Sequence, residues 1–182
     1  MRSSYEESFA IIKERVEIIG EPRPGVTRPP RHDDEAPGPS IFRALVEDVS
    51  LTDLTLTGLF VGRSELKRVS FHGADLRVSA INWSDLSDCD FSGADLSGAD
   101  LRACRFVRCS FAGANLSEAD LRRSTFEGCE LKGATMRGSK LHRARRVLGI
   151  FKSGTGQDAI PLSRAQRDDV AWCEEGLEPG SG

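Results

Sequence analysis

Residues 71–101 read FHGADLRVSAINWSDLSDCDFSGADLSGADL, and a large apolar residue occupies every fifth position of this stretch. The period continues in both directions without a break, from Ile41 to Leu141. The residues at this position are Ile41, Val46, Leu51, Leu56, Val61, Leu66, Phe71, Leu76, Ile81, Leu86, Phe91, Leu96, Leu101, Phe106, Phe111, Leu116, Leu121, Phe126, Leu131, Met136 and Leu141. Neither the 3.6-residue period of a helix nor the two-residue period of a strand accounts for this spacing. The sequence therefore predicts a repeat architecture.

The positions around the large residue are also restricted. Two residues before it the side chain is mostly Ala, Ser or Cys, one before it is often Asp or Asn, and two after it is often Gly. Units such as Ala94-Asp95-Leu96 and Ala114-Asn115-Leu116 follow this pattern. They resemble the A-(D/N)-L-x-x motif of the pentapeptide repeat family, and the resemblance covers residues 41–141.

This resemblance implies an all-β solenoid, namely a right-handed quadrilateral β-helix with four pentapeptides in each coil. The large residue and the small residue two before it would face inward. Residues 41–146 would then form about five coils, about 24 Å tall at about 4.8 Å per coil. A solenoid of this kind has open ends, so both ends need a cap.

The segments that flank the repeat differ from it in composition. Residues 1–20 are predicted to form an amphipathic helix, because Ser4 and Glu7 have the spacing of a capping box. Its apolar stripe comprises Tyr5, Phe9, Ile12, Val16 and Ile19. Residues 21–40 hold six of the eight prolines and are predicted to be an extended linker. Residues 147–182 are predicted to be a C-terminal cap and tail with a short helix near 164–175.

Charge and cysteine usage exclude several classes of protein. The formal charge is −3, which argues against a strongly basic nucleic-acid binder, so we consider direct nucleic-acid binding unfavourable. A membrane-spanning helix needs about 18 consecutive apolar residues, and no run in the sequence is that long. The N-terminus lacks the apolar core of a signal peptide. Five cysteines without an export signal favour free thiols in a reducing compartment. We therefore expect a cytoplasmic protein without membrane partners.

Aligning the sequence one coil of four pentapeptides at a time predicts what each side of the solenoid exposes. One side carries Arg43, Arg63, Trp83, Ala103, Arg123 and Arg143 in one column, with Arg102, Arg122 and His142 beside it. We interpret this side as a basic face, which Asp100 and Asp120 only partly offset. The face would bind an acidic partner, or it would hold the chain's own acidic N-terminal helix. The candidate partner-binding residues are Arg43, Arg63, Trp83, Arg102, Arg122, Arg123 and Arg143.

The remaining columns favour structural roles. Asp48, Arg68, Asp88 and Arg108 alternate in sign and predict ion pairs between coils. A flat side carries glycines at 73, 93, 113 and 133. An inward column carries Cys89, Cys109 and Cys129, which could bind a soft metal but which we interpret as core filling.

No catalytic, cofactor or metal site is predicted. His32, His72 and His142 do not converge, no histidine lies near Cys104 and Cys109, and a filled solenoid has no natural pocket.

The leading hypothesis is a non-enzymatic scaffold or protein-interaction module with a protein partner. The alternative comes from the family, some of whose members imitate DNA, bind a type II topoisomerase such as gyrase and protect it from inhibitors. Those proteins are usually longer and strongly acidic, whereas residues 41–141 here carry 14 acidic and 13 basic side chains. Either end could dock on a second copy, so a monomer and a homodimer are both compatible with the sequence.

Overall fold

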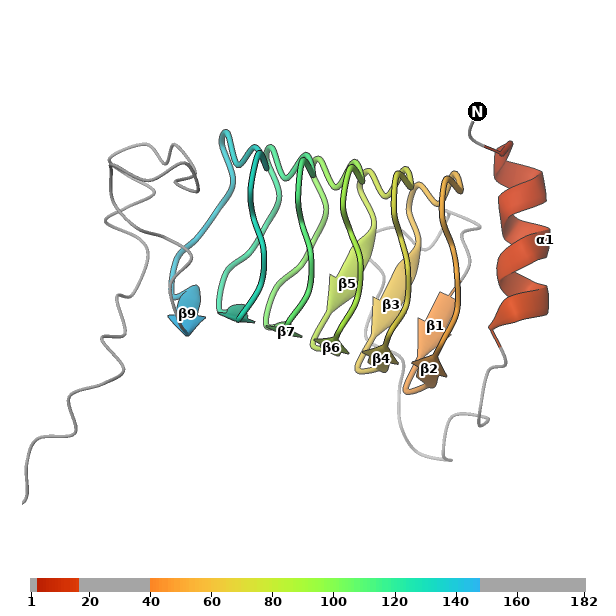
Figure 1. The fold of residues 1–182 in the computed structure, drawn as a ribbon, viewed down its shortest axis with the longest axis horizontal. Helices are drawn as coiled ribbons and strands as arrows, with labels where there is room; N and C mark the ends of the chain where they lie inside the picture. Colours follow the sequence, from red (N-terminus) through yellow and green to blue (C-terminus); the bar gives the residue numbers. More distant parts are fainter. Residues whose placement is uncertain (1–2, 17–39, 148–182) are drawn as a thin grey trace, which may run out of the picture.

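The computed structural model describes residues 3–16 and 40–147. It contains one helix followed by nine short strands (Figure 1). These elements are α1 (Tyr5–Arg15), β1 (Ser40–Phe42), β2 (Leu45–Glu47), β3 (Phe60–Gly62), β4 (Glu65–Lys67), β5 (Ala80–Asn82), β6 (Asp85–Ser87), β7 (Arg105–Val107), β8 (Thr125–Glu127) and β9 (Arg145–Val147). The predicted linker up to residue 39, the C-terminal cap and tail after Val147 and the helix near 164–175 lie outside the described residues.

The strands form parallel ladders in which each residue pairs with the residue four pentapeptides further along the chain. One sheet has the order β1-β3-β5 and the other β2-β4-β6-β7-β8-β9. Leu45 pairs with Glu65 at the start of the larger sheet, and Thr125 pairs with Arg145 at its end. Isolated parallel bridges such as Ser50 with Ser70 and Thr55 with Asp75 connect the other two sides. Residues 40–147 therefore form a four-sided parallel β-solenoid, which confirms the predicted fold class.

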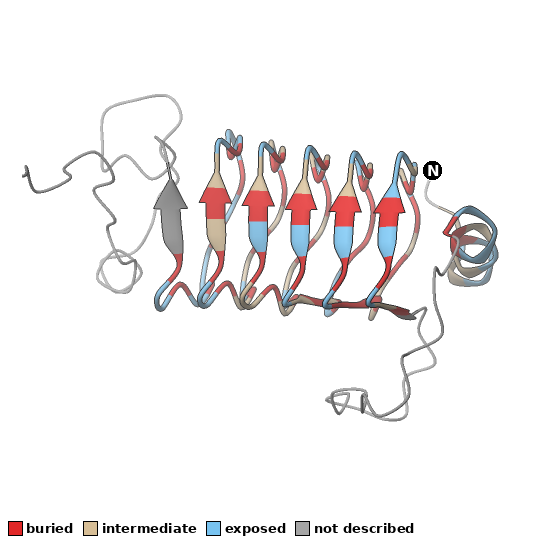
Figure 2. Cartoon of the chain, turned by 90° about the horizontal axis from the view of Figure 1, so that it is seen from below, coloured by how far each residue is buried: buried red, intermediate tan, exposed pale blue. Residues whose placement is uncertain are grey.

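The predicted inward residues fill the axis of the solenoid. In the strands of the larger sheet from β2 to β8 the central residue is buried (Figure 2). Phe91 lies between Phe71 and Phe111, with ring centroids 4.9 and 5.0 Å apart and nearly parallel planes. The small residues two positions earlier, such as Cys89 and Ala94, are buried beside them. Stacked rings on one side and small side chains next to them give the close packing that a solid core requires.

Asp and Asn before the large residue have a local structural role. In six pentapeptides the side-chain oxygen of this residue accepts a hydrogen bond from the backbone N–H two residues later. The distances are 2.8 Å from Ser92 to Asp90 and 3.1 Å from Ser117 to Asn115. The other four acceptors are Asp75, Asp95, Asp100 and Asp120. This Asx-type bond satisfies a backbone donor at the turn and explains the preference for Asp or Asn at that position.

Helix α1 caps the N-terminal end of the solenoid. The predicted capping box of Ser4 and Glu7 is present, and Ile12 and Val16 join the core cluster. Ser8 is fully buried, and its hydroxyl accepts a hydrogen bond of 2.9 Å from the backbone N–H of Thr55. The Arg15 guanidinium donates to the carbonyl of Ser50. The helix thus lies over the first coil, so the hypothesis that it docks on the basic face is wrong.

Within the described residues, no helix combines the length and the apolar character needed to cross a membrane.

Candidate functional site: a basic hollow

The basic column occupies successive corners of the solenoid. Arg63, Trp83, Ala103, Arg123 and Arg143 each follow a buried central residue by two positions, and their φ angles lie between 50° and 64°. A residue with this left-handed backbone turns the chain from one side of the coil to the next. Because the ladders pair each residue with its equivalent one coil later, the column places one corner side chain on each coil.

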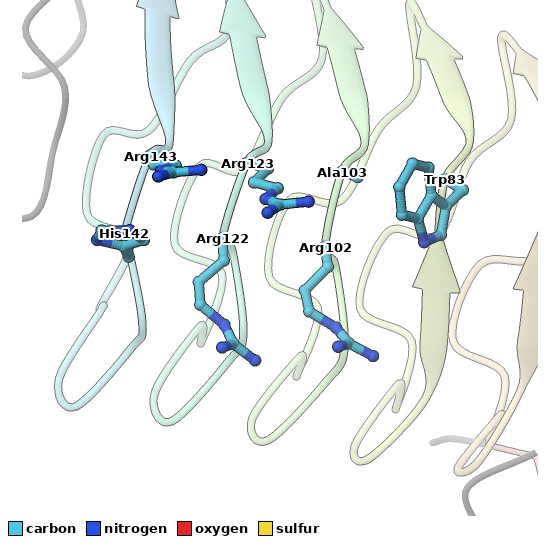
Figure 3. A pocket seen from close by; sticks show the side chains of 7 residues that line it. All are labelled: Trp83, Arg102, Ala103, Arg122, Arg123, His142 and Arg143. Atoms are coloured by element: carbon cyan, nitrogen blue, oxygen red, sulfur yellow. The ribbon is translucent and has the colours of Figure 1, made fainter.

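Seven residues around this column line a hollow with a volume of about 450 Å³ (Figure 3), so the expectation that a filled solenoid has no pocket is wrong for this face. They are Trp83, Arg102, Ala103, Arg122, Arg123, His142 and Arg143. Ala103 is the one small member of its column, so the surface is lower between Trp83 and Arg123. The hollow therefore results from a single truncated corner within a row of large ones.

Two of the lining arginines are paired with carboxylates. Arg102 donates to both oxygens of Asp100 at 2.7 Å, and Arg122 donates to Asp120 at 2.8 and 2.6 Å. Burial alone would raise the pKa of Asp100, but hydrogen bonds from Arg102 and Asn82 more than offset it and lower that pKa. The same balance, with Arg122 as the donor, lowers the pKa of Asp120. These two arginines contribute shape and donors to the hollow more than net charge.

The other two lining arginines are uncompensated. Among the described residues, neither Arg123 nor Arg143 forms a salt bridge with a carboxylate, and both side chains are exposed. Figure 3 shows the Arg143 side chain extending toward Arg123 and the Arg123 side chain extending toward Ala103. Trp83 is 59% exposed. The hollow thus combines a free aromatic face with free positive charge.

The structure brings together five of the seven predicted partner-binding residues. Trp83, Arg102, Arg122, Arg123 and Arg143 line the hollow. Arg63 and Arg43 lie further along the same column and do not line it, and the Arg43 guanidinium lies 5.7 Å from the centroid of the Phe42 ring. Ala103 and His142 line the hollow although they were not among the predicted partner-binding residues. The signal for Ala103 was its small size within a column of large residues.

The charged column of the neighbouring side forms ion pairs between coils, as predicted. Arg68 donates to both oxygens of Asp48 at 2.6 and 2.8 Å, and Arg108 donates to both oxygens of Asp88 at 2.7 Å. These hydrogen bonds lower the pKa of Asp48 and of Asp88. The column consists of two separate pairs, each joining one coil to the next.

The side that carries the glycines holds a small polar network. His72 Nδ1 lies 2.8 Å from the hydroxyl of Ser92 on the next coil, and that hydroxyl donates to Asp90. The hydroxyl therefore donates its proton to a carboxylate and not to the imidazole, which is the reverse of the order that activates a serine nucleophile.

The cysteines of the repeat are buried free thiols. Cys89, Cys109 and Cys129 stack in one column and donate to backbone carbonyls at 3.4 to 3.5 Å. Cys104 also donates to a carbonyl, and burial raises its pKa to about 12. Within residues 3–16 and 40–147 no group of three or more His, Cys, Asp or Glu residues is arranged to hold a metal ion.

The fold and its five-residue units define a class of protein, and sequence comparison agrees with it. Residues 84–123 and 104–143 match the family described as pentapeptide repeats, with eight copies. Residues 84–143 thus carry pentapeptide repeats. No curated protein matches the sequence.

Several solved structures are similar to the chain. A pentapeptide repeat protein from the thylakoid lumen of Arabidopsis thaliana is 25% identical, with 69% of this chain and 72% of that chain covered and a TM-score of 0.32. A pentapeptide repeat protein from the cyanobacterium Cyanothece 51142 is 19% identical, with 55% and 85% covered and a TM-score of 0.27. A trypsin-treated form of QnrB1, a plasmid-mediated fluoroquinolone resistance protein, is 16% identical, with 59% and 74% covered and a TM-score of 0.30.

Proposed function

We propose that this protein is a non-enzymatic interaction module that binds an acidic protein partner through its basic face. The observation that carries the proposal is the exposed Trp83 beside Arg123 and Arg143, which have no carboxylate partner among the described residues. Tryptophan and arginine are the residues that most often dominate the energy of protein interfaces. Free guanidinium groups also attract acidic partners and bind carboxylates in a bidentate manner.

Other arginines of the solenoid are already engaged. Arg68, Arg105 and Arg108 each donate to both oxygens of a carboxylate on a neighbouring coil. A partner would have to break these pairs before it could use the same guanidinium groups. The basic face requires no such exchange at Arg63, Arg123 or Arg143, so it is the side on which an acidic surface gains most.

The test is affinity capture with a triple variant. The immobilised wild-type protein should retain an acidic protein that elutes as the salt concentration rises, because exposed charge pairs are screened by salt. The variant with Arg63, Trp83 and Arg123 changed to Ala should lose that protein. The control variant Arg68→Ala with Arg108→Ala removes positive charge from the neighbouring side and should retain it. A partner held equally well by the triple variant would show that another surface binds it.

The topoisomerase alternative predicts a different surface. A DNA mimic needs a continuous acidic stripe, but Asp48, Asp88, Asp100 and Asp120 are each paired with an arginine. These pairs disfavour the alternative. A gyrase supercoiling assay tests it directly, with and without a quinolone and with micromolar protein. Protection of gyrase that survives the triple variant would replace the acidic-partner proposal.

A further inference from the structure

The gap at Ala103 has the dimensions of a slot for one flat side chain. Trp83 lies one coil before Ala103 and Arg123 one coil after it. At about 4.8 Å per coil, the backbones of Trp83 and Arg123 are about 10 Å apart. A ring that stacks between two planar groups needs about 3.5 Å on each side, or about 7 Å in total. The backbone spacing therefore leaves room for one aromatic ring over the methyl group of Ala103, in the hollow that Trp83, Ala103 and Arg123 line.

The residues one coil before and one coil after Ala103 both carry planar groups that can stack on aromatic rings. The indole of Trp83 makes no ring contact and no cation–π contact within the part of the chain that the structure describes. The guanidinium of Arg123 is exposed and extends toward Ala103 (Figure 3). Indole and guanidinium groups both favour a stacked aromatic neighbour. An inserted ring would thus complete contacts that the free protein leaves unmade.

The charge around the slot indicates what flanks the ring. Arg143 lies beyond Arg123 on one side, and Arg63 lies beyond Trp83 on the other. From the proposed function, we infer further that the partner binds through an acidic segment with an aromatic side chain between its carboxylates, and that this ring enters the slot over Ala103. Among the lining arginines only Arg123 and Arg143 are uncompensated within the described residues, which is few for a continuous phosphate backbone.

Ala103→Arg is the decisive variant because it closes the slot without disturbing the fold. The equivalent corners at Arg43, Arg63, Arg123 and Arg143 already carry arginine, with φ angles between 50° and 64°. The variant also adds positive charge, so it separates the loss of the slot from the loss of attraction. The control Ala112→Arg adds the same charge elsewhere, at a position where Lys132 shows on the next coil that a long cation is accepted.

The test compares two fluorescein-labelled peptides by anisotropy, one with Phe between two runs of four Glu and one with Ala in place of Phe. The wild-type protein and Ala112→Arg should bind the Phe peptide about tenfold more tightly than the Ala peptide. Ala103→Arg should bind the two peptides equally, and should bind the Ala peptide at least as tightly as the wild type does. A labelled short oligothymidylate should bind more weakly than the Phe peptide.

Each of the other outcomes refutes a defined part of the proposal. Equal binding of both peptides to the wild type, or a preference for Phe that survives in Ala103→Arg, would overturn the slot but leave the acidic-partner proposal standing. Absence of salt-sensitive binding of either peptide would overturn both. Tighter binding of the oligothymidylate would overturn the acidic segment and identify a nucleic acid as the occupant.

Discussion

At the scale of single residues, the backbone conformation at the corners explains why glycine is frequent there and what it costs to place another residue there. The third residue of each pentapeptide, counted from the large one, has a positive φ angle whether it is Gly93 at 65° or Arg63 at 50°. Glycine adopts this conformation without steric cost, whereas other L-residues lose about 1 to 2 kcal/mol. The preference for glycine was visible in the sequence. The corner conformation that causes it was not, because more than half of the corners carry other residues.

At the Val78 corner, burial of the side chain does little to offset the strain of the positive φ angle. Val78 is β-branched, has a φ angle of 50° and is 67% exposed. We predict that Val78→Gly stabilises the protein by about 1 kcal/mol, because it removes the strain and sacrifices little packing. Urea unfolding should show a higher midpoint with an unchanged slope.

The matched control for Val78 is Gly93→Ala. A Cβ at Gly93 would meet no atom within 4 Å, so only the backbone strain changes. This variant should lose about 1 kcal/mol. A loss of stability in Val78→Gly would mean that the valine side chain has a stabilising contact that outweighs its strain.

Asn115 illustrates why one of the six Asx-type turns has an amide where the other five have a carboxylate. Its amide donates to Asp95 on the previous coil at 3.1 Å, while its oxygen accepts from Ser117. We predict that Asn115→Asp destabilises the protein by about 1 to 2 kcal/mol at neutral pH, because it replaces a hydrogen bond with two adjacent carboxylates. The loss should shrink as the pH falls toward about 4, where one of the two carboxyl groups binds a proton. Adding Asp95→Asn should restore the lost stability, and failure of this rescue would exclude the pairing as the cause.

At the scale of elements, the helix and its cap were predictable, but its position was not. The capping box depends on residues three apart in the sequence, so Ser4 and Glu7 reveal it directly. The docking site depends on which apolar surface is left uncovered, and both the basic face and the open end were compatible with the sequence. The hydrogen bond between Ser8 and Thr55 favours docking on the open end of the solenoid, because it pairs two polar groups that would otherwise be buried without a partner.

Removal of an apolar contact under the helix should loosen the first coil in particular. We predict that Ile12→Ala, at a buried position, costs about 2 kcal/mol. Hydrogen exchange should accelerate in residues 41–60 and remain unchanged beyond residue 100, because each coil contacts only its neighbours. Glu14→Ala, at an exposed position of the same helix, should change neither quantity. Uniform acceleration along the whole solenoid would show that the rod unfolds as one unit.

At the scale of the whole molecule, the sequence predicted the four sides and the column that each carries. It did so because the core position recurs every five residues and therefore fixes the register. The hollow was harder to predict from the sequence than the sides were. Its shape depends on the direction of long arginine side chains, and its charge depends on whether Arg102 and Arg122 bind Asp100 and Asp120 or project freely. Side-chain pairing of this kind does not follow from the backbone period.

Acid should destabilise the solenoid through its paired aspartates. The folded-state pKa of Asp100 is lowered, so this group stabilises the native protein above the pKa of about 3.9 that an unfolded Asp has. The contribution disappears as the pH falls through the lower, folded-state value. We therefore predict that the melting temperature is nearly constant between about pH 5 and 7 and declines below about pH 4.

The variant Asp100→Asn isolates this contribution. It should be less stable than the wild type at pH 7 and should lose less stability between pH 5 and 3 than the wild type does. Parallel melting curves for the two proteins over that range would mean that Asp100 does not carry the acid dependence.

The constant register between coils also constrains how such a chain can change in length during evolution. An insertion of one pentapeptide keeps every large residue in the core, yet it turns everything after it by a quarter of the square. Placed between Trp83 and Arg123, it would leave a stable rod whose two basic halves point in different directions. Only the gain or loss of a complete coil preserves the alignment, so descendants that keep this surface should differ in length by whole coils within the rod.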